Sequence, residues 1–384
     1  MSKNNPYSLY IHIPWCIKKC PYCDFNSHEK REDYDEQAYI DALIKDLNFE
    51  AQHLQSRTLS SIFIGGGTPS LFSATSFQRL LSAVRSALVC ADNMEITLEA
   101  NPGTAESSKF KDFHDIGINR LSIGIQSFND KHLKLLGRIH NAHQAQTAIE
   151  MAQHAGFNKI NLDLMFGLPQ QTTQQASEDI RLALSYQTGH ISHYQLTLEK
   201  NTLFYKKPPA LPDDDLIWEM QTACQKHLKQ NLQHYEISAY AAEQHQAKHN
   251  LNYWQFGDYL GIGAGAHSKL THNKHSITRS WKTKHPRQFV EHAGSEKSIS
   301  GQSVLQDNEL PFEFAMNALR LKNGFTLQQY QQRTGLHPST IQPTLTTLLE
   351  KELIQLNQLT YACTDRGWNF LNETLEYFLP STSI

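Results

Sequence analysis

The chain has 384 residues, of which 39% are hydrophobic and 19% charged, with a formal net charge of −3 and a pI near 6.7. These values are typical of a globular protein with one large domain and a smaller one. They give no electrostatic reason to expect nucleic acid or an anionic membrane as a partner. No apolar run approaches the ~20 residues of a membrane-spanning helix, and the N-terminus lacks the apolar segment of a signal peptide, so we expect a cytoplasmic protein.

Three of the six cysteines lie close together near the N-terminus. Cys16, Cys20 and Cys23 have the spacing C-x3-C-x2-C and directly follow Leu9–Ile13, whose alternating pattern predicts a strand. In a reducing compartment such a cluster is more typical of metal binding than of disulfides. The spacing favours an iron–sulfur cluster, because three thiolates leave one iron open to a small molecule.

A zinc site is the alternative for the same cysteines. Structural zinc takes four protein ligands, usually in two pairs, and the sequence has no second cysteine cluster downstream. His12 and His28 are the candidates for a fourth ligand, so the spacing alone leaves this alternative open.

The first two hundred residues alternate between strand and helix patterns. The predicted strands are Leu9–Ile13, Ser61–Ile64, Glu95–Leu98, Arg120–Ile125, Lys159–Leu164 and His193–Leu198. The predicted helices between them are 33–55, 76–88, 106–116, 143–155 and 177–184. Strands that alternate with helices predict a parallel sheet. Six units are too few for a closed eight-stranded barrel, so we expect an open (β/α)6 partial TIM-like barrel.

Polar residues and glycines gather where these strands end. They are the three cysteines, Gly65–Thr68, Glu99, Gln126, Asp163 and Glu199. In barrel-like α/β folds this rim carries the active site. The three glycines lack the Gly-Lys-Ser/Thr sequence of a phosphate loop, so we interpret them as a place where the backbone approaches a ligand closely.

The second half of the chain changes character. Residues 1–240 are predicted to form the barrel core, 241–305 a sheet extension and connecting segment, and 306–384 a C-terminal, mainly helical domain. Three helices and a hairpin in the last part are typical of a winged-helix-like module. Acidic side chains outnumber basic ones there, whereas a DNA-binding domain needs a basic face, so no nucleic-acid partner is expected.

Six motifs occur in order over residues 8–270. They are Tyr10-Ile-His-Ile-Pro-Trp-Cys-x3-Cys-x2-Cys, Gly-Gly-Gly-Thr-Pro, Glu99-Ala-Asn-Pro, Gly124-Ile-Gln126-Ser-Phe, Gly137-Arg138 and Asp163-Leu-Met-Phe-Gly-Leu-Pro. This series resembles the radical S-adenosylmethionine (SAM) enzymes and, more narrowly, the oxygen-independent coproporphyrinogen III oxidase group. The resemblance covers nearly the whole chain, the C-terminal part included.

The resemblance implies a set of cofactor-binding residues. Cys16, Cys20 and Cys23 would bind a [4Fe–4S] cluster whose open iron takes the amino and carboxylate groups of SAM. The residues placed around SAM are Tyr10, Tyr22, Gly66, Gly67, Thr68, Glu99, Gln126, Arg138 and Asp163. The Arg138 guanidinium suits the SAM carboxylate. One electron from the cluster would cleave SAM to a 5′-deoxyadenosyl radical, which is chemistry supplied by the cofactor.

Two departures from the oxidases point to a sister group. The oxidases have a fourth cysteine two residues after the third, whereas Asp24-Phe25 follows Cys23 here, and they carry a longer segment before the cluster. Together with His249-Asn-Leu-Asn-Tyr-Trp254, these features resemble the HemW-type haem chaperones. That resemblance implies haem as a further ligand, with His249 as the candidate axial residue.

The same resemblance implies delivery of haem to haem-requiring acceptor proteins, respiratory ones among the candidates, with a homodimer as a candidate assembly. The alternative function is an oxygen-independent coproporphyrinogen III dehydrogenase. No catalytic residue is assigned, and enzyme activity is left open.

Overall fold

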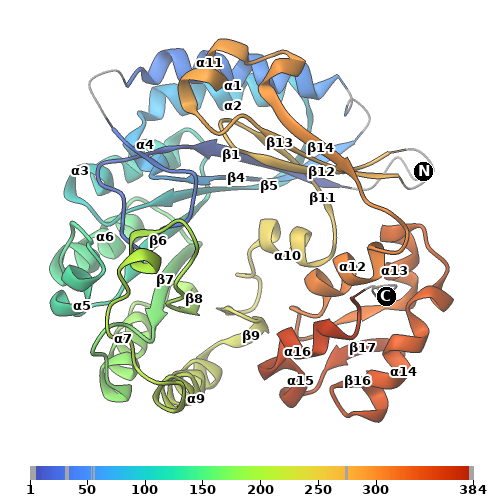
Figure 1. The fold of residues 1–384 in the computed structure, drawn as a ribbon. Helices are drawn as coiled ribbons and strands as arrows, with labels where there is room; N and C mark the ends of the chain where they lie inside the picture. The colour runs from blue at the N-terminus through green and yellow to red at the C-terminus, as the bar shows by residue number, and fades with distance from the viewer. Residues whose placement is uncertain (1–5, 31–33, 53, 55–56, 273–275, 380–384) are drawn as a thin grey trace.

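The structure, a computed structural model, describes residues 6–30, 34–52, 54, 57–272 and 276–379. Within these residues a 12-stranded sheet has the order β14-β13-β12-β11-β1-β4-β5-β6-β7-β8-β10-β9. Its central part, from β11 to β8, is parallel and curves into an open barrel (Figure 1). The parallel strands are β1 (Tyr7–Ile13), β4 (Thr58–Gly66), β5 (Val89–Ala100), β6 (Arg120–Gln126), β7 (Ile160–Phe166), β8 (Gly189–Gln195) and β11 (Asp258–Ile262).

The predicted barrel is confirmed, because β1, β4, β5, β6, β7 and β8 are neighbours in chain order and parallel. The last predicted strand was placed too late. β8 begins at Gly189 rather than His193, because Gly189, with φ +79°, allows a tight turn directly before the strand. Antiparallel strands extend both edges of the sheet. They are β9 (Gln233–Glu236), β10 (Ala239–Ala241), β12 (His267–Thr271), β13 (Ile277–Lys282) and β14 (Ile299–Val304).

Helices cover the outer, convex face of the sheet (Figure 1). They are α1 (Glu36–Ala51), α2 (Ala74–Ala87), α3 (Thr104–Ser107), α4 (Phe110–Asp115), α5 (Asp130–Leu135), α6 (Ala142–His154), α7 (Thr173–Ser185), α9 (Asp214–Asn231) and α11 (Pro286–His292). The short helix α8 (Leu203–Lys206) instead contacts the cysteine loop, where Phe204 N donates to Pro21 O at 2.9 Å. Asn141 and Thr172 each begin a helix with a capping box, which satisfies the first free backbone N–H groups of α6 and α7. The predicted helix 106–116 is instead divided between α3 and α4. In the described part of the chain, no helix is both long and apolar enough to cross a membrane.

Strand alternation divides the side chains of the barrel between two environments. On β1, Leu9 and Ile11 are fully buried in the apolar core beneath the helices. Tyr10 points the other way, into the barrel, where its ring stacks on Phe63 of β4 with centroids 6.3 Å apart. The outer layer therefore stabilises the fold, and the inner layer is free to carry polar groups.

One helix, α10 (Lys248–Trp254), lies on the concave side of the sheet (Figure 1). His249 was predicted to lie in the sheet extension and connecting segment of residues 241–305, and its position there is helical. The reason is local: the i→i−4 hydrogen bond from Leu251 N to Ala247 O closes the first turn. The helix thus brings residues predicted to belong to a connecting segment into the interior of the barrel.

The C-terminal part has its own apolar cluster. Its elements are α12 (Leu310–Ala318), α13 (Leu327–Thr334), α14 (Gln342–Glu350), α15 (Asp365–Asn369), α16 (Leu371–Glu376), β15 (Phe325–Thr326), β16 (Ile354–Asn357) and β17 (Thr360–Cys363). The last three form a small antiparallel sheet, as the winged-helix-like pattern predicts. Phe256 and Ile277 of the middle segment are buried in the same cluster, whereas other residues of that segment are buried in the barrel core. The segment therefore packs against both the barrel and the C-terminal part. The boundaries at 240 and 305 stay a prediction.

The buried His193 allows a test of acid stability. It stacks on Phe166 with ring centroids 4.6 Å apart, and burial lowers its pKa to about 3. The unfolded chain therefore takes up this proton first, so the contribution of His193 to stability is complete above pH 6.5 and is lost as pH falls toward 3. Between pH 7 and pH 5 we expect the free energy of unfolding to fall by about 2 kcal/mol through this residue.

His193→Phe keeps an aromatic ring against Phe166 and removes the titrating group. Urea unfolding at the two pH values should show a shallower loss for the variant than for the parent protein. Equal losses would contradict this role of His193.

Candidate site at the carboxyl ends of the barrel strands

The cysteine loop leaves β1 and folds back onto the barrel. Cys16 ends β2 (Trp15–Cys16), which pairs with β3 (His28–Glu29), and a tight turn joins Cys23 N to Cys20 O at 3.1 Å. Asn26 anchors the far side of the loop, because its amide Nδ2 donates to the carbonyls of Ala264 and Lys284, each at 2.9 Å. The loop is therefore held by residues more than two hundred positions away.

The glycine-rich end of β4 lies directly against this loop. Gly67 N donates to Ile13 O and Thr68 N to Trp15 O, both at 2.7 Å. Gly66 has φ +116°, and a Cβ at this position would overlap the imidazole of His12. The close backbone approach that the sequence indicated is thus made, among the described residues, to the cysteine loop itself.

Arg138 connects the cysteine loop to the barrel. Its Nη1 donates to Cys20 Sγ at 3.5 Å, and its Nη2 donates to Asn101 Oδ1 at 2.5 Å and to Gly124 O at 2.9 Å. Burial by itself lowers the pKa of the guanidinium, but the neighbouring Tyr22 and Cys20 raise it overall, so the group keeps its charge. Its Nε is buried and has no hydrogen-bond partner within the described chain.

Two carboxyl groups lie inside the barrel below the loop. Glu99 Oε2 accepts a hydrogen bond from Gly66 N at 3.0 Å, yet burial raises the pKa of this group to about 8, and the nearby Asp163 adds to the shift. Asp163 accepts from Ser122 Oγ and Asn161 Nδ2, and burial raises its pKa to about 6. Both groups can therefore accept hydrogen bonds or hold a proton near neutral pH.

Further predicted residues line the same interior. Gln126 ends β6 with φ +67°, an unusual conformation for a residue with a side chain, and its Oε1 accepts from Tyr194 OH at 2.9 Å. Tyr10 and His12 form a pair of side chains on β1, with Tyr10 OH 2.9 Å from His12 Nδ1. Glu199, which the pattern placed on the rim, is instead exposed and accepts from Thr197.

One of the two histidines considered as a fourth zinc ligand, His12, is engaged by other parts of the protein. His12 has both ring nitrogens engaged, with Nε2 2.9 Å from Asn26 O, and burial lowers its pKa to about 4. Within the described residues no group of three or more His, Cys, Asp or Glu side chains converges on a single metal ion. A cubane cluster does not require such convergence, since each thiolate binds a different iron.

His249 lies in a separate layer of the interior. It is only 2% exposed and stacks on Phe63 with centroids 4.9 Å apart. Tyr253 packs edge-on against it at 4.5 Å. Both ring nitrogens are buried without a hydrogen-bond partner in the part of the chain described, and burial lowers the pKa of the ring to about 3. The imidazole is therefore neutral and has lone-pair capacity that the surrounding protein does not use.

Sequence reasoning missed two asparagines that hold the site together. Asn101 bridges Arg138 and Thr68, since its Nδ2 donates to Thr68 Oγ1 at 2.7 Å. It follows Glu99 by two positions at the same strand end, so the strand-end pattern was a usable signal. Asn26 carried no such signal, because its partners Ala264 and Lys284 are distant in sequence.

Comparison with known proteins identifies the chain. It is 48% identical to heme chaperone HemW of Haemophilus influenzae, over 99% of both chains, and 44% identical to that of Escherichia coli K12, over 99% of this chain and 100% of the relative. The chain belongs to the HemW family. The Radical SAM superfamily model matches residues 10–183, and the HemN C-terminal domain model matches residues 305–370.

Wider relatives agree with this placement. A Danio rerio protein named radical S-adenosyl methionine domain-containing protein 1, mitochondrial, is 32% identical over 84% of this chain and 75% of its own. The structure of coproporphyrinogen III oxidase (HemN) from Escherichia coli superposes with a TM-score of 0.82, covering 98% of this chain and 90% of that one. At 20% identity, the likeness to HemN shows the fold alone.

HemW proteins are radical SAM proteins, so a [4Fe–4S] cluster and SAM are cofactors of this chain. The described residues fit them in two respects. The loop presents thiols beside a charged guanidinium, and that guanidinium has an unused buried N–H at Nε.

The close packing of Gly66 on His12 gives a test of loop geometry. Gly66→Ala forces a side chain into a positive φ and into the imidazole, which we expect to cost about 1–3 kcal/mol of unfolding free energy. Urea unfolding of the metal-free protein measures this cost. Iron content after anaerobic reconstitution shows whether the cysteine loop still takes up a cluster. Gly103→Ala is the control, because the nearest atom to its added Cβ lies 3.4 Å away. Equal stability of the two variants would show that the loop does not depend on this contact.

Proposed function

We propose that this protein is a haem chaperone that binds haem, holds a SAM-ligated [4Fe–4S] cluster and delivers haem to acceptor proteins. The observation that carries the proposal is the similarity, over the full length of both chains, to proteins named heme chaperone HemW at 48% and 44% identity. The matched length spans the cysteine loop, the barrel strands, α10 and the C-terminal domain, which supports the proposal.

The cluster and SAM are assigned to the rim described above. We assign Cys16, Cys20 and Cys23 to the cluster. The residues assigned to SAM are Tyr10, Tyr22, Gly66, Gly67, Thr68, Glu99, Gln126, Arg138 and Asp163. When bound, the pair can supply one-electron cleavage of the SAM sulfonium. The protein's own contribution is a cation, Arg138, beside the cysteine loop and two carboxyl groups, Glu99 and Asp163, in the barrel interior.

His249 is assigned as the axial haem ligand. A neutral imidazole is the form that binds iron, and the two unpartnered ring nitrogens support this role. The exposed fraction of 2% means that iron cannot reach the ring unless α10 or the aromatic residues around it move.

The alternative function is oxidation of coproporphyrinogen III, which the motif series implies through its resemblance to the oxygen-independent oxidases. Against it stands residue 25, where the resemblance calls for a fourth cysteine. Phe25 occupies that position and is 59% exposed beside the cluster loop. Respiratory acceptors, a homodimer and a cytoplasmic location are part of the proposal and rest on the sequence.

One anaerobic experiment separates the two functions. Protein reconstituted with iron and sulfide should bind haem stably, with a Soret band that persists through gel filtration. Supplied with coproporphyrinogen III, SAM and a reductant, it should form no protoporphyrinogen. Turnover of that substrate would replace the chaperone proposal with the alternative.

The axial ligand is tested by His249→Ala. We expect loss or a marked shift of the Soret band, because the iron loses its imidazole. His193→Ala is the matched control, since His193 is also buried and also stacked on a phenylalanine, with a pKa near 3. A spectrum unchanged in His249→Ala would place the ligand elsewhere, whereas equal changes in both variants would indicate a loss of folding.

A further inference from the structure

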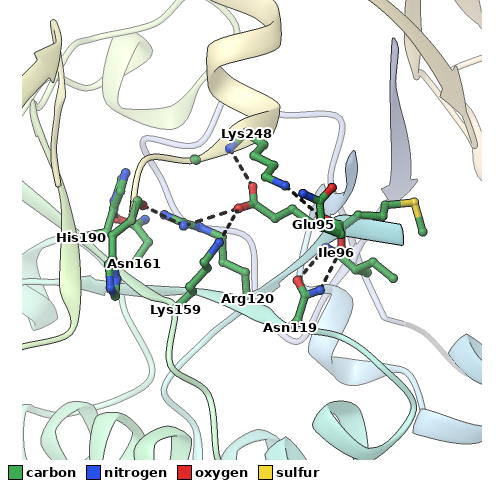
Figure 2. A network of polar contacts seen from close by, with 12 residues as sticks. Glu95, Ile96, Asn119, Arg120, Lys159, Asn161, His190 and Lys248 are labelled. Carbon is green, nitrogen blue, oxygen red and sulfur yellow. Dashed lines mark hydrogen bonds and ion pairs between the residues drawn. The ribbon is translucent and has the colours of Figure 1, made fainter. Parts of the chain in front are cut away.

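Polar side chains from the barrel strands hold the chain where it enters α10 (Figure 2). Glu95 of β5 is buried, and its Oε1 accepts a hydrogen bond from the backbone N–H of Lys248 at 2.8 Å. The Lys248 ammonium donates to Asn93 O at 2.8 Å, also on β5. The first residue of α10 is therefore attached to one strand at two points.

The residues just before α10 are held in the same way. Arg120, the first residue of β6, is 1% exposed, and its Nη1 donates to the carbonyl of His245 at 2.9 Å. Ala247 N donates to Tyr235 OH at 3.4 Å, and that hydroxyl is 3.0 Å from Nε2 of His190 on β8. Side chains of three strands, β5, β6 and β9, thus bind backbone groups within residues 245–248.

The anchoring side chains Glu95 and Arg120 also carry opposite charges and lie close to each other. Arg120 Nη1 lies 3.7 Å from Glu95 Oε2, and Lys159 Nζ lies 3.9 Å from the same oxygen (Figure 2). A buried ion pair by itself adds little net stability, because desolvation offsets the attraction. Here, however, both charged groups also bind the backbone that leads into α10, and hydrogen bonds to charged groups are stronger than neutral ones.

The anchored stretch ends one residue before His249. With Lys248 fixed on Glu95, the His249 ring lies flat against Phe63 and Tyr253 closes its edge. The same packing that leaves both nitrogens without a partner also excludes a molecule as large as haem. With α10 in this position, the proposed haem ligand His249 is in place, but the surrounding side chains cover it.

We propose that Glu95 and Arg120 are positioning residues for His249: they anchor the start of α10 to β5 and β6, and haem reaches the ring when this anchor opens. The inference rests on the proposed function in taking His249 as the haem ligand. A purely structural ion pair would stabilise the whole barrel, whereas this anchor has its effect on α10 and on the rate at which haem binds.

The decisive substitution is Lys248→Pro. Lys248 is the first residue of the helix, where proline is well tolerated, and Ala247 before it is extended with ψ 114°. The proline ring removes the N–H that Glu95 accepts without changing either buried charge. Lys248→Ala is the baseline, because it removes the same ammonium but keeps the N–H. Glu95→Gln is the second variant, since it keeps an accepting oxygen and the side-chain size but removes the charge beside Arg120.

Hydrogen exchange of the haem-free protein measures how firmly α10 is held in the absence of haem. Amides of residues 249–254 should exchange at least about tenfold faster in Lys248→Pro than in Lys248→Ala, while β4 and β5 exchange at unchanged rates. Glu95→Gln should show a smaller increase in the same residues relative to the parent protein. Equal exchange in Lys248→Pro and Lys248→Ala, or no increase in Glu95→Gln, would overturn the anchor.

Stopped-flow absorbance with free haem measures how fast haem binds when the anchor is weakened. The association rate constant should rise about tenfold in Lys248→Pro relative to Lys248→Ala, in parallel with the exchange rates. Faster exchange with an unchanged haem association rate would overturn the inference and leave the chaperone proposal intact. An unchanged haem spectrum in His249→Ala would instead overturn the ligand assignment, while the exchange experiment would still decide whether the anchor exists.

Discussion

The site depends on a backbone-to-backbone contact between the cysteine loop and the end of β4. Gly67 and Thr68 donate to the carbonyls of Ile13 and Trp15 at 2.7 Å, and Gly66 lies against the His12 ring where a Cβ has no room. Ordering a loop costs conformational entropy, and these hydrogen bonds help to offset that cost. The contact therefore holds the loop that carries the three thiols against the barrel.

The barrel interior shows which polar groups are structural and which are available. Asn161 and His190 satisfy each other through a short hydrogen bond, and Tyr235 continues the chain. Such a satisfied network gives a rigid wall. The His249 ring nitrogens have no such partner in the described residues. Buried groups without partners are costly, so this contrast between neighbours is a physical reason to assign function to His249.

The C-terminal domain contributes to the same arrangement from outside the barrel. Arg320 lies over the ring of Trp254 at 4.2 Å and pairs with Glu236 at 3.4 Å, so the end of α10 and the edge strand β9 contact one residue of that domain. A helix held by the barrel at its start and by another domain at its end is suited to respond to events in either. Both ends of the helix that carries His249 are therefore held by residues outside the helix.

The sequence alone determined the parallel barrel and its polar rim, because periodicity and strand-end residues depend on local chain geometry. It also identified the cysteine loop and its relatives, since motif spacing is itself local. It misplaced the start of β8, did not predict the helix that carries His249 and gave no sign of Asn26. Only the tertiary structure showed that Glu95 meets Lys248, the first residue of α10, across 153 positions. The reason is physical: a sequence pattern indicates which face of a helix or strand is buried. It does not indicate which distant element that face packs against, and long-range contacts depend on this.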